Sequence, residues 1–153
     1  MIPSLISLSD SPWRALPPGI HNASIQEVSD CFGYNKRRRE LIAGLILACK
    51  ALKACGCRTL FLDGSFVTEK NVPGDFDGCW DPDGVNPILI DPVLLDFDDQ
   101  RKEQKLKFGG ELFPSNAAAD GNGLSFLDFF QIDKYSSLEK GIIKINLVDE
   151  TFG

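Results

Sequence analysis

Histidine is nearly missing from this 153-residue chain, which has only His21. A catalytic Ser-His or Cys-His pair would therefore have to use His21, and no neighbouring residue supports that role. A basic excess is missing too, because 16 Lys and Arg residues face 22 Asp and Glu residues, for a net charge of −6. An extended nucleic-acid-binding surface normally needs such an excess, so we expect any polynucleotide to be bound only locally.

Long apolar runs are also missing. The stretch 41–57 is interrupted by Gly44, Lys50 and Lys53, and so does not approach the roughly 18 apolar residues of a membrane span. Residues 1–3 do not begin a basic segment followed by an apolar core and a cleavage site, as a secretory signal would. We therefore expect a cytoplasmic protein with no membrane partner.

Cysteine occurs an odd number of times, which is unlike a secreted disulfide framework. The five residues are Cys31, Cys49, Cys55, Cys57 and Cys79. The pair Cys55-Gly56-Cys57 is too closely spaced for a usual zinc site, and no second Cys/His pair follows it. We expect all five to be small buried hydrophobic residues of a reducing compartment.

The remaining composition is that of one globular domain over residues 1–153, with 43% hydrophobic and 25% charged residues. A capping-box spacing at Ser24 and Glu27 and the Asp91-Pro92 pair each predict a helix start. Helices are predicted over 24–32, 36–54 and 92–106, a helical turn over 65–70, strands over 58–62, 75–80, 108–114 and 142–147, a loop over 116–123 and an aromatic element over 126–132. This order predicts an α/β (α+β) fold, in which helices pack mainly on one face of a mixed sheet.

The stretch from Leu60 to Trp80, L-F-L-D-G-S-F-V-T-E-K-N-V-P-G-D-F-D-G-C-W, carries the strongest functional signal. Asp75 and Asp77 are two residues apart in a predicted strand, so both carboxylates project from one face and can bind the same metal ion. The Gly64-Ser65 corner before them offers backbone N–H groups to a phosphate. A phosphate site beside a carboxylate pair indicates nucleotide chemistry.

This pattern resembles the polymerase-β-like nucleotidyltransferase superfamily, whose hallmark is Gly-Ser, a short spacer and Asp-x-Asp. It is most similar to a small bacterial group with the signature G-S-F-V-T, a Pro and D-x-D, followed by F-F-Q-x-D-K and K-G-I-x-x-I. In this chain the matching segments are Gly64 to Thr68, Pro73, Asp75 to Asp77, Phe129 to Lys134 and Lys140 to Ile145. The likeness covers roughly Gly19 to Leu147.

The resemblance implies nucleotidyl transfer with two Mg²⁺ ions held between the triphosphate and the carboxylates of Asp75 and Asp77. A third acid normally comes from the strand after the next helix, which indicates Glu111 as both a metal ligand and a catalytic residue. Asp91 is a rival for that role, although it also fits the cap of the following helix.

Phosphate contacts are expected from Gly64 and Ser65, and Lys70 is a local candidate for a triphosphate contact. The basic run 36–39 is either a solvated helix start or a contact for substrate phosphates, RNA or an acidic partner. The acceptor hydroxyl could belong to a small molecule, an RNA end or a protein.

Two other functions stay open. The chain has Thr68-Glu69-Lys70 and Gly74 where superfamily members usually place a Gly and a Ser. A catalytically degenerate member could serve as an interaction module, such as an antitoxin-like protein partner. A nucleotide sensor would keep the aspartate pair without needing the third acid.

Overall fold

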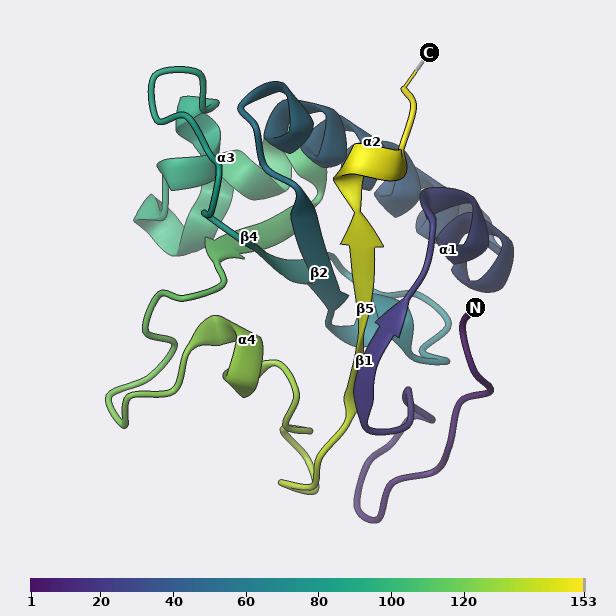
Figure 1. Cartoon of the computed structure of the whole chain (residues 1–153). Helices are drawn as coiled ribbons and strands as arrows, with labels where there is room; N and C mark the ends of the chain where they lie inside the picture. Colours follow the sequence, from purple (N-terminus) through teal and green to yellow (C-terminus); the bar gives the residue numbers. More distant parts are fainter. Residues whose placement is uncertain (153) are drawn as a thin grey trace.

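A five-stranded mixed sheet forms the centre of the computed structural model, which describes residues 1–152 (Figure 1). The strand order is β1-β5-β2-β3-β4. β2 is antiparallel to its neighbours β5 and β3, whereas the outer pairs β1–β5 and β3–β4 are parallel. The strands are β1 (Gly19–Asn22), β2 (Thr59–Asp63), β3 (Phe76–Trp80), β4 (Gly110–Pro114) and β5 (Gly141–Asn146).

Three helices cover one face of this sheet, and the main core lies between them and the strands. They are α1 (Ile25–Phe32), α2 (Lys36–Ala54) and α3 (Asp98–Phe108). The short α4 (Phe126–Phe129) lies apart from them in Figure 1 and packs with a second, smaller core on the opposite face. Three 3₁₀ turns complete the part of the chain that the structure describes: η1 (Ser65–Val67), η2 (Pro92–Leu95) and η3 (Leu147–Asp149). The predicted α+β fold is therefore confirmed.

The helix starts follow from local side chains. Ser24 and Glu27 form the predicted capping box at the start of α1, so two N–H groups of the first turn are satisfied. Asn35 caps α2 by accepting a hydrogen bond from the Arg38 N–H. The N–H of Cys57 returns to the Leu52 carbonyl at the end of α2, and the chain turns directly into β2.

The helix predicted over 92–106 is wrong in its bounds, because the structure has η2 and then α3 in this region. Asp91 caps only a 3₁₀ turn, and the extended backbone of Asp96 (φ −92°, ψ 102°) ends it. Phe108, predicted as the start of a strand, is the last residue of α3. Gly109 follows in the left-handed conformation (φ 78°) as its C-cap, so β4 begins only at Gly110.

The helix predicted over 36–54 is confirmed as α2, and the strands predicted over 58–62 and 142–147 are shifted by one residue in β2 and β5. Two other predicted elements are shorter than expected, and one strand was not predicted. The turn predicted over 65–70 is the single turn η1, and the aromatic element over 126–132 is helical only in α4. The strand β1 lies in Gly-Ile-His-Asn, which has no clear apolar alternation. Its pairing depends on β5, which lies more than a hundred residues later.

Four cysteines are buried as expected, but Cys31 is exposed on α1, so the prediction for that residue is wrong. Its position on α1 points away from the stripe formed by Ile25, Val28 and Phe32, which is buried against the core. Within residues 1–152, no helix has the length and apolar character needed to cross a membrane.

Candidate functional site

Carboxylates form a row across three neighbouring strands, on the sheet face opposite α1, α2 and α3. Asp63 on β2 is the register partner of Asp77 on β3, and Asp77 is the partner of Glu111 on β4. Asp75 directly precedes β3. Because side chains alternate along a strand, the intervening Phe76 points into the helix-side core instead. The row therefore results from the strand register, not from one local segment.

The structure brings the three predicted acids together. One carboxylate oxygen from each of Asp75, Asp77 and Glu111 lies within 4.8 Å of the other two, and all three residues are half-buried. The rival Asp91 is engaged elsewhere, because its carboxylate caps η2 through the Val93 N–H and forms an ion pair with Lys107 at 2.5 Å. We call Asp75, Asp77 and Glu111 the acidic triad.

The Gly64-Ser65 corner lies directly against this triad. Gly64 has φ 88°, and a Cβ atom at this position would lie 2.6 Å from Asp77 Oδ2. Only glycine therefore fits, both for its backbone conformation and for the close approach. Ser65 is the first residue of η1, where N–H groups lack partners within the turn.

Two consecutive arginines of α2 hold the segment between this corner and Asp75. Arg38 is fully buried, and its guanidinium donates hydrogen bonds to the carbonyl oxygens of Phe66 (2.6 Å) and Thr68 (2.7 Å). Arg37 donates to the carbonyl oxygens of Pro73 and Gly74. Both readings of the basic run were therefore wrong for Arg38, which is neither solvated nor available to a phosphate.

Burial and charge crowding perturb the two aspartates. Burial, followed by the charges of Asp75, Asp63 and Glu111, raises the pKa of Asp77 to about 8. Burial and the charge of Glu111 also raise the pKa of Asp75. Both shifts mean that the folded chain resists carrying adjacent negative charges at this point. A bound cation would relieve this resistance.

Glu111 differs from the two aspartates because α3 supplies it with two cations. Arg101 Nη2 lies 3.0 Å and Lys105 Nζ 2.9 Å from Glu111 Oε1. Burial raises the pKa of Glu111, but the hydrogen bonds from Lys105 and Arg101 outweigh it and hold the pKa below its ordinary value. The backbone of 99–101 is left-handed, with φ between 50° and 61°, and this conformation is unfavourable for side chains other than glycine.

A buried ion pair next to the triad was not predicted from the sequence. Lys140, the residue before β5, donates a hydrogen bond to Asp63 Oδ1, and their side chains are only 12% and 6% exposed. Burial raises the pKa of Asp63, and the charge of Lys140 opposes that rise. The available signal was an aspartate directly before the Gly64 corner, at the end of an otherwise apolar strand.

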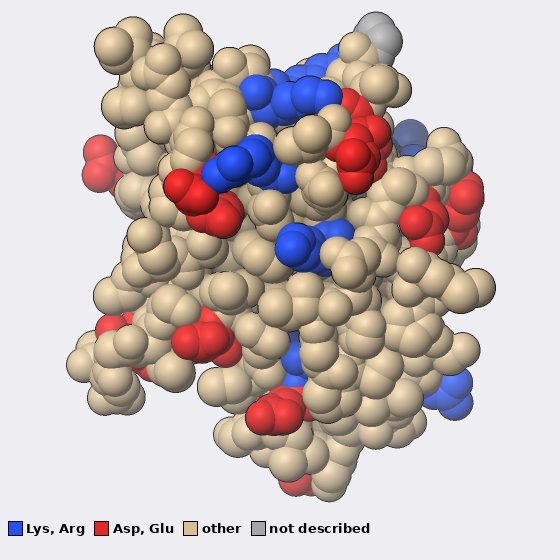
Figure 2. Space-filling view, viewed as in Figure 1, with Lys and Arg blue, Asp and Glu red and all other residues tan. Residues whose placement is uncertain are grey.

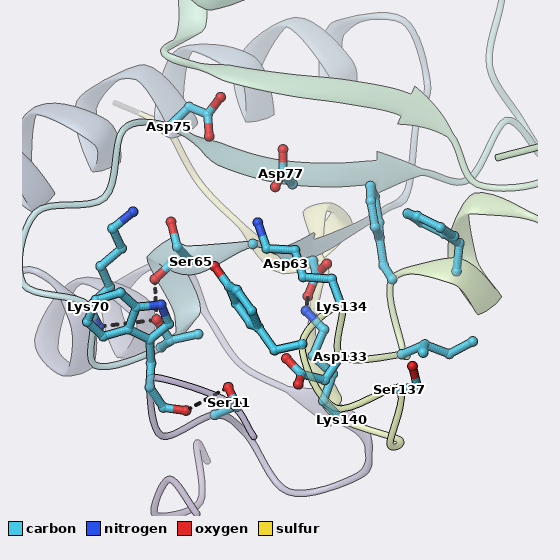
Figure 3. A pocket seen from close by; sticks show the side chains of 18 of the residues that line it. Ser11, Asp63, Ser65, Lys70, Asp75, Asp77, Asp133, Lys134, Ser137 and Lys140 are labelled. Atoms are coloured by element: carbon cyan, nitrogen blue, oxygen red, sulfur yellow. Dashed lines mark hydrogen bonds and ion pairs between the residues drawn. The ribbon is translucent and has the colours of Figure 1, made fainter. Parts of the chain in front are cut away.

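Asp75, Asp77 and the Gly64-Ser65 corner open into a cleft of about 650 Å³, within the range of small-molecule sites. Figure 3 shows Asp75, Asp77 and Ser65 on one side, with Lys134 extending toward them from the other side and Lys140 directed at Asp63. Glu111 does not line the cleft, although Lys70 does. The lining residues used below are Trp13, Asp63, Gly64, Ser65, Lys70, Asp75, Asp77, Asp120, Asp133, Lys134, Tyr135 and Lys140.

In the view of Figure 2 most of the surface is neither acidic nor basic, and the basic side chains that gather in the upper middle have acidic side chains at their edges. Lys70 is placed beside the cleft mouth, with its Nζ 5.7 Å from the Trp13 ring centroid. Its side chain can therefore reach an anion that enters the cleft.

Comparison with family models matches residues 10–146 to a family of unknown function (DUF6932). No curated protein and no solved structure matches the chain. The matched span includes the acidic triad, the Gly64-Ser65 corner and all residues that line the cleft.

Proposed function

We propose that this chain, which belongs to the family of unknown function DUF6932, is an Mg²⁺-dependent nucleotidyltransferase-like protein. The proposal is based on the chemistry of the cleft. It binds a nucleoside triphosphate and transfers the nucleoside monophosphate to a hydroxyl acceptor: the acceptor oxygen bonds to the α-phosphorus, the bond to the β-phosphate breaks, and pyrophosphate leaves. One observation carries this proposal, namely three carboxylates with oxygens within 4.8 Å of one another, two of which, Asp75 and Asp77, line a cleft of about 650 Å³ together with the Gly64 corner.

The donor set fits Mg²⁺. Each member of the triad offers a carboxylate oxygen, and Mg²⁺ is a hard cation that prefers oxygen ligands and shares its coordination sphere with substrate phosphates. Asp75 and Asp77 would hold the metal, with Glu111 as the third ligand. When bound, the metal would neutralise charge on the phosphates and polarise the phosphorus that is attacked.

The chain's own residues would position the substrate. The N–H groups at the start of η1, after Gly64, would donate to phosphate oxygens, as N–H groups at helix starts do. Lys70 would supply a positive charge at the cleft mouth. A Glu111 carboxylate released from its ion pairs could accept the proton of the attacking hydroxyl.

A labelling experiment tests the transfer. Wild-type protein is incubated with Mg²⁺, cell extract and a nucleoside triphosphate labelled either at the α- or at the γ-phosphate. We expect the α-label, and not the γ-label, to appear on an acceptor, and the double variant Asp75→Asn/Asp77→Asn to abolish the signal. The variant Asp98→Asn, which changes an exposed carboxylate on α3, is the control. Transfer that persists in the double variant would refute the proposal.

A nucleotide sensor is the second candidate, and one observation favours it. Glu111 is already paired with Arg101 and Lys105 and does not line the cleft, so it is poorly placed to act as a base in this conformation. A sensor would bind the triphosphate with Mg²⁺ and transfer no label. Equilibrium binding of the same nucleotides separates the two functions.

A further inference from the structure

The segment between α4 and β5 is built as a hairpin-like loop along one wall of the cleft. The N–H of Lys140 donates to the Gln131 carbonyl at 2.9 Å, and the N–H of Asp133 donates to the Leu138 carbonyl at 2.8 Å. At the tip, the buried Asp133 carboxylate accepts hydrogen bonds from the N–H and the hydroxyl of Ser136. The loop therefore has its own hydrogen bonds and presents its side chains in a defined position.

Lys134 lies at the tip of this loop and lines the cleft. Within residues 1–152, its ammonium group donates no hydrogen bond, and it lies 5.1 Å from the ring centroid of the neighbouring Tyr135. Lys134 is exposed and forms no ion pair within residues 1–152, although its charge opposes the rise in the pKa of Asp75. Figure 3 shows it across the cleft from Asp75.

Lys140 lies at the base of the same loop, where β5 begins. Its pairing with the buried Asp63 fixes the side chain at the cleft floor. An ammonium group has three donors, and Asp63 accepts from one of them. Donors therefore remain for a ligand in the cleft.

The charges of the cleft explain why such cations are needed. Five aspartates line it, Asp63, Asp75, Asp77, Asp120 and Asp133, against three lysines. A polyphosphate would be repelled by these carboxylates, even with its reacting phosphate neutralised at the triad. Lys134 and Lys140 would offset that repulsion along the rest of the anion.

We infer that Lys134, from the loop that faces the acidic triad, and Lys140, from the cleft floor beside Asp63, bind the phosphate chain of the substrate. This inference rests on the proposed function and adds its substrate specificity: the cleft selects a nucleoside triphosphate over the monophosphate. The loop supplies charge to the distal phosphates, whereas the triad and the Gly64 corner hold the reacting one.

The test uses isothermal titration calorimetry of ATP and AMP in Mg²⁺ buffer. Lys134→Met keeps the methylene stem and removes the charge, and Lys102→Met on α3 is the exposed control. Lys140→Met alone would leave Asp63 buried without a counterion, so the second variant is Asp63→Asn/Lys140→Met. Binding of Mn²⁺ alone, measured by electron paramagnetic resonance, reports whether the triad is intact.

For each cleft variant we expect ATP affinity to fall about tenfold, the loss of one charge-assisted contact. AMP affinity should change less than twofold, and binding of Mn²⁺ alone should be unchanged. ATP affinity equal to wild type in both variants would overturn the lysine assignment and leave the proposed function intact. A wild-type protein that binds no ATP with Mg²⁺ would overturn both.

Discussion

Replacing Asp77 by Asn should stabilise the metal-free protein, because the folded chain resists the charge at this position. The ordinary pKa of an aspartate is 3.8, and the value for folded Asp77 is about 8. A pH of 7 is about three units above the pKa of this group in the unfolded chain, and at that pH folding requires the Asp77 carboxylate to take up a proton. Since one pKa unit corresponds to about 1.4 kcal/mol, this costs the folded state at most about 4 kcal/mol.

The expected gain is about half of that limit. Asp77 is half-buried, and residual contact with water screens its charge. Asn carries no charge in either state, so Asp77→Asn should raise the free energy of unfolding by about 2 kcal/mol at pH 7. Mg²⁺ should reverse the order, because it stabilises only a protein that keeps its carboxylate ligands.

The pH dependence has a definite sign. Because folding raises the pKa of Asp77, its contribution to wild-type stability is fully present below about pH 4 and is lost as the pH rises through 8. The gain from Asp77→Asn should thus be near zero at pH 4 and largest at pH 8. Urea unfolding in EDTA at both pH values measures it, with Asp98→Asn as the exposed control. The reasoning would be refuted if the Asp77→Asn variant were less stable than wild type at pH 8. It would also be refuted if the difference in free energy of unfolding between variant and wild type were the same at both pH values.

Three further variants test the frame of the site. Gly64→Ala should lower the free energy of unfolding by about 2 kcal/mol or more, because the backbone φ is positive and the added Cβ clashes with the Asp77 carboxylate. Thermal unfolding measures the loss, with Gly74→Ala as the control, since a Cβ at that position meets no atom within 4 Å. Arg38→Met should cost about 3 kcal/mol in urea unfolding because four carbonyl oxygens lose their donor, whereas the exposed Arg39→Met should cost under about 0.5 kcal/mol. Arg101→Gln should raise Mn²⁺ affinity several-fold by freeing the third acid; unchanged or weaker binding would contradict that competition.

The parts of the site that could be predicted are those specified within a few residues. Gly64 and Asp77 lie in one strand-turn-strand segment, so their spacing alone predicts proximity. Glu111 could be reached because a helix and the following strand return the chain beside β3. The bounds of α3 could not be predicted, because the break at Asp96 arises from a backbone conformation that the charged sequence 96–103 does not reveal.

The parts that could not be predicted depend on distant pairings. Asp63 and Lys140 are 77 residues apart, and only the antiparallel register of β2 and β5 brings them together. The burial of Arg38 could not be predicted either, because a run of four basic residues is typical of a solvated helix face. Its burial follows from carbonyl oxygens of the 66–70 segment that turn toward α2, and no sequence pattern encodes that turn.

The distribution of counterions across the carboxylate row is the strongest argument for a cation site. At one end Asp63 is paired with Lys140, and at the other Glu111 is paired with Arg101 and Lys105. Between them, no ion pair within residues 1–152 involves Asp75 or Asp77. Ion pairing thus ends on either side of Asp75 and Asp77, and their raised pKa values mean that the fold disfavours adjacent negative charges at this point. A bound cation would remove that cost, so the centre of the row is where a metal ion would be most strongly stabilised.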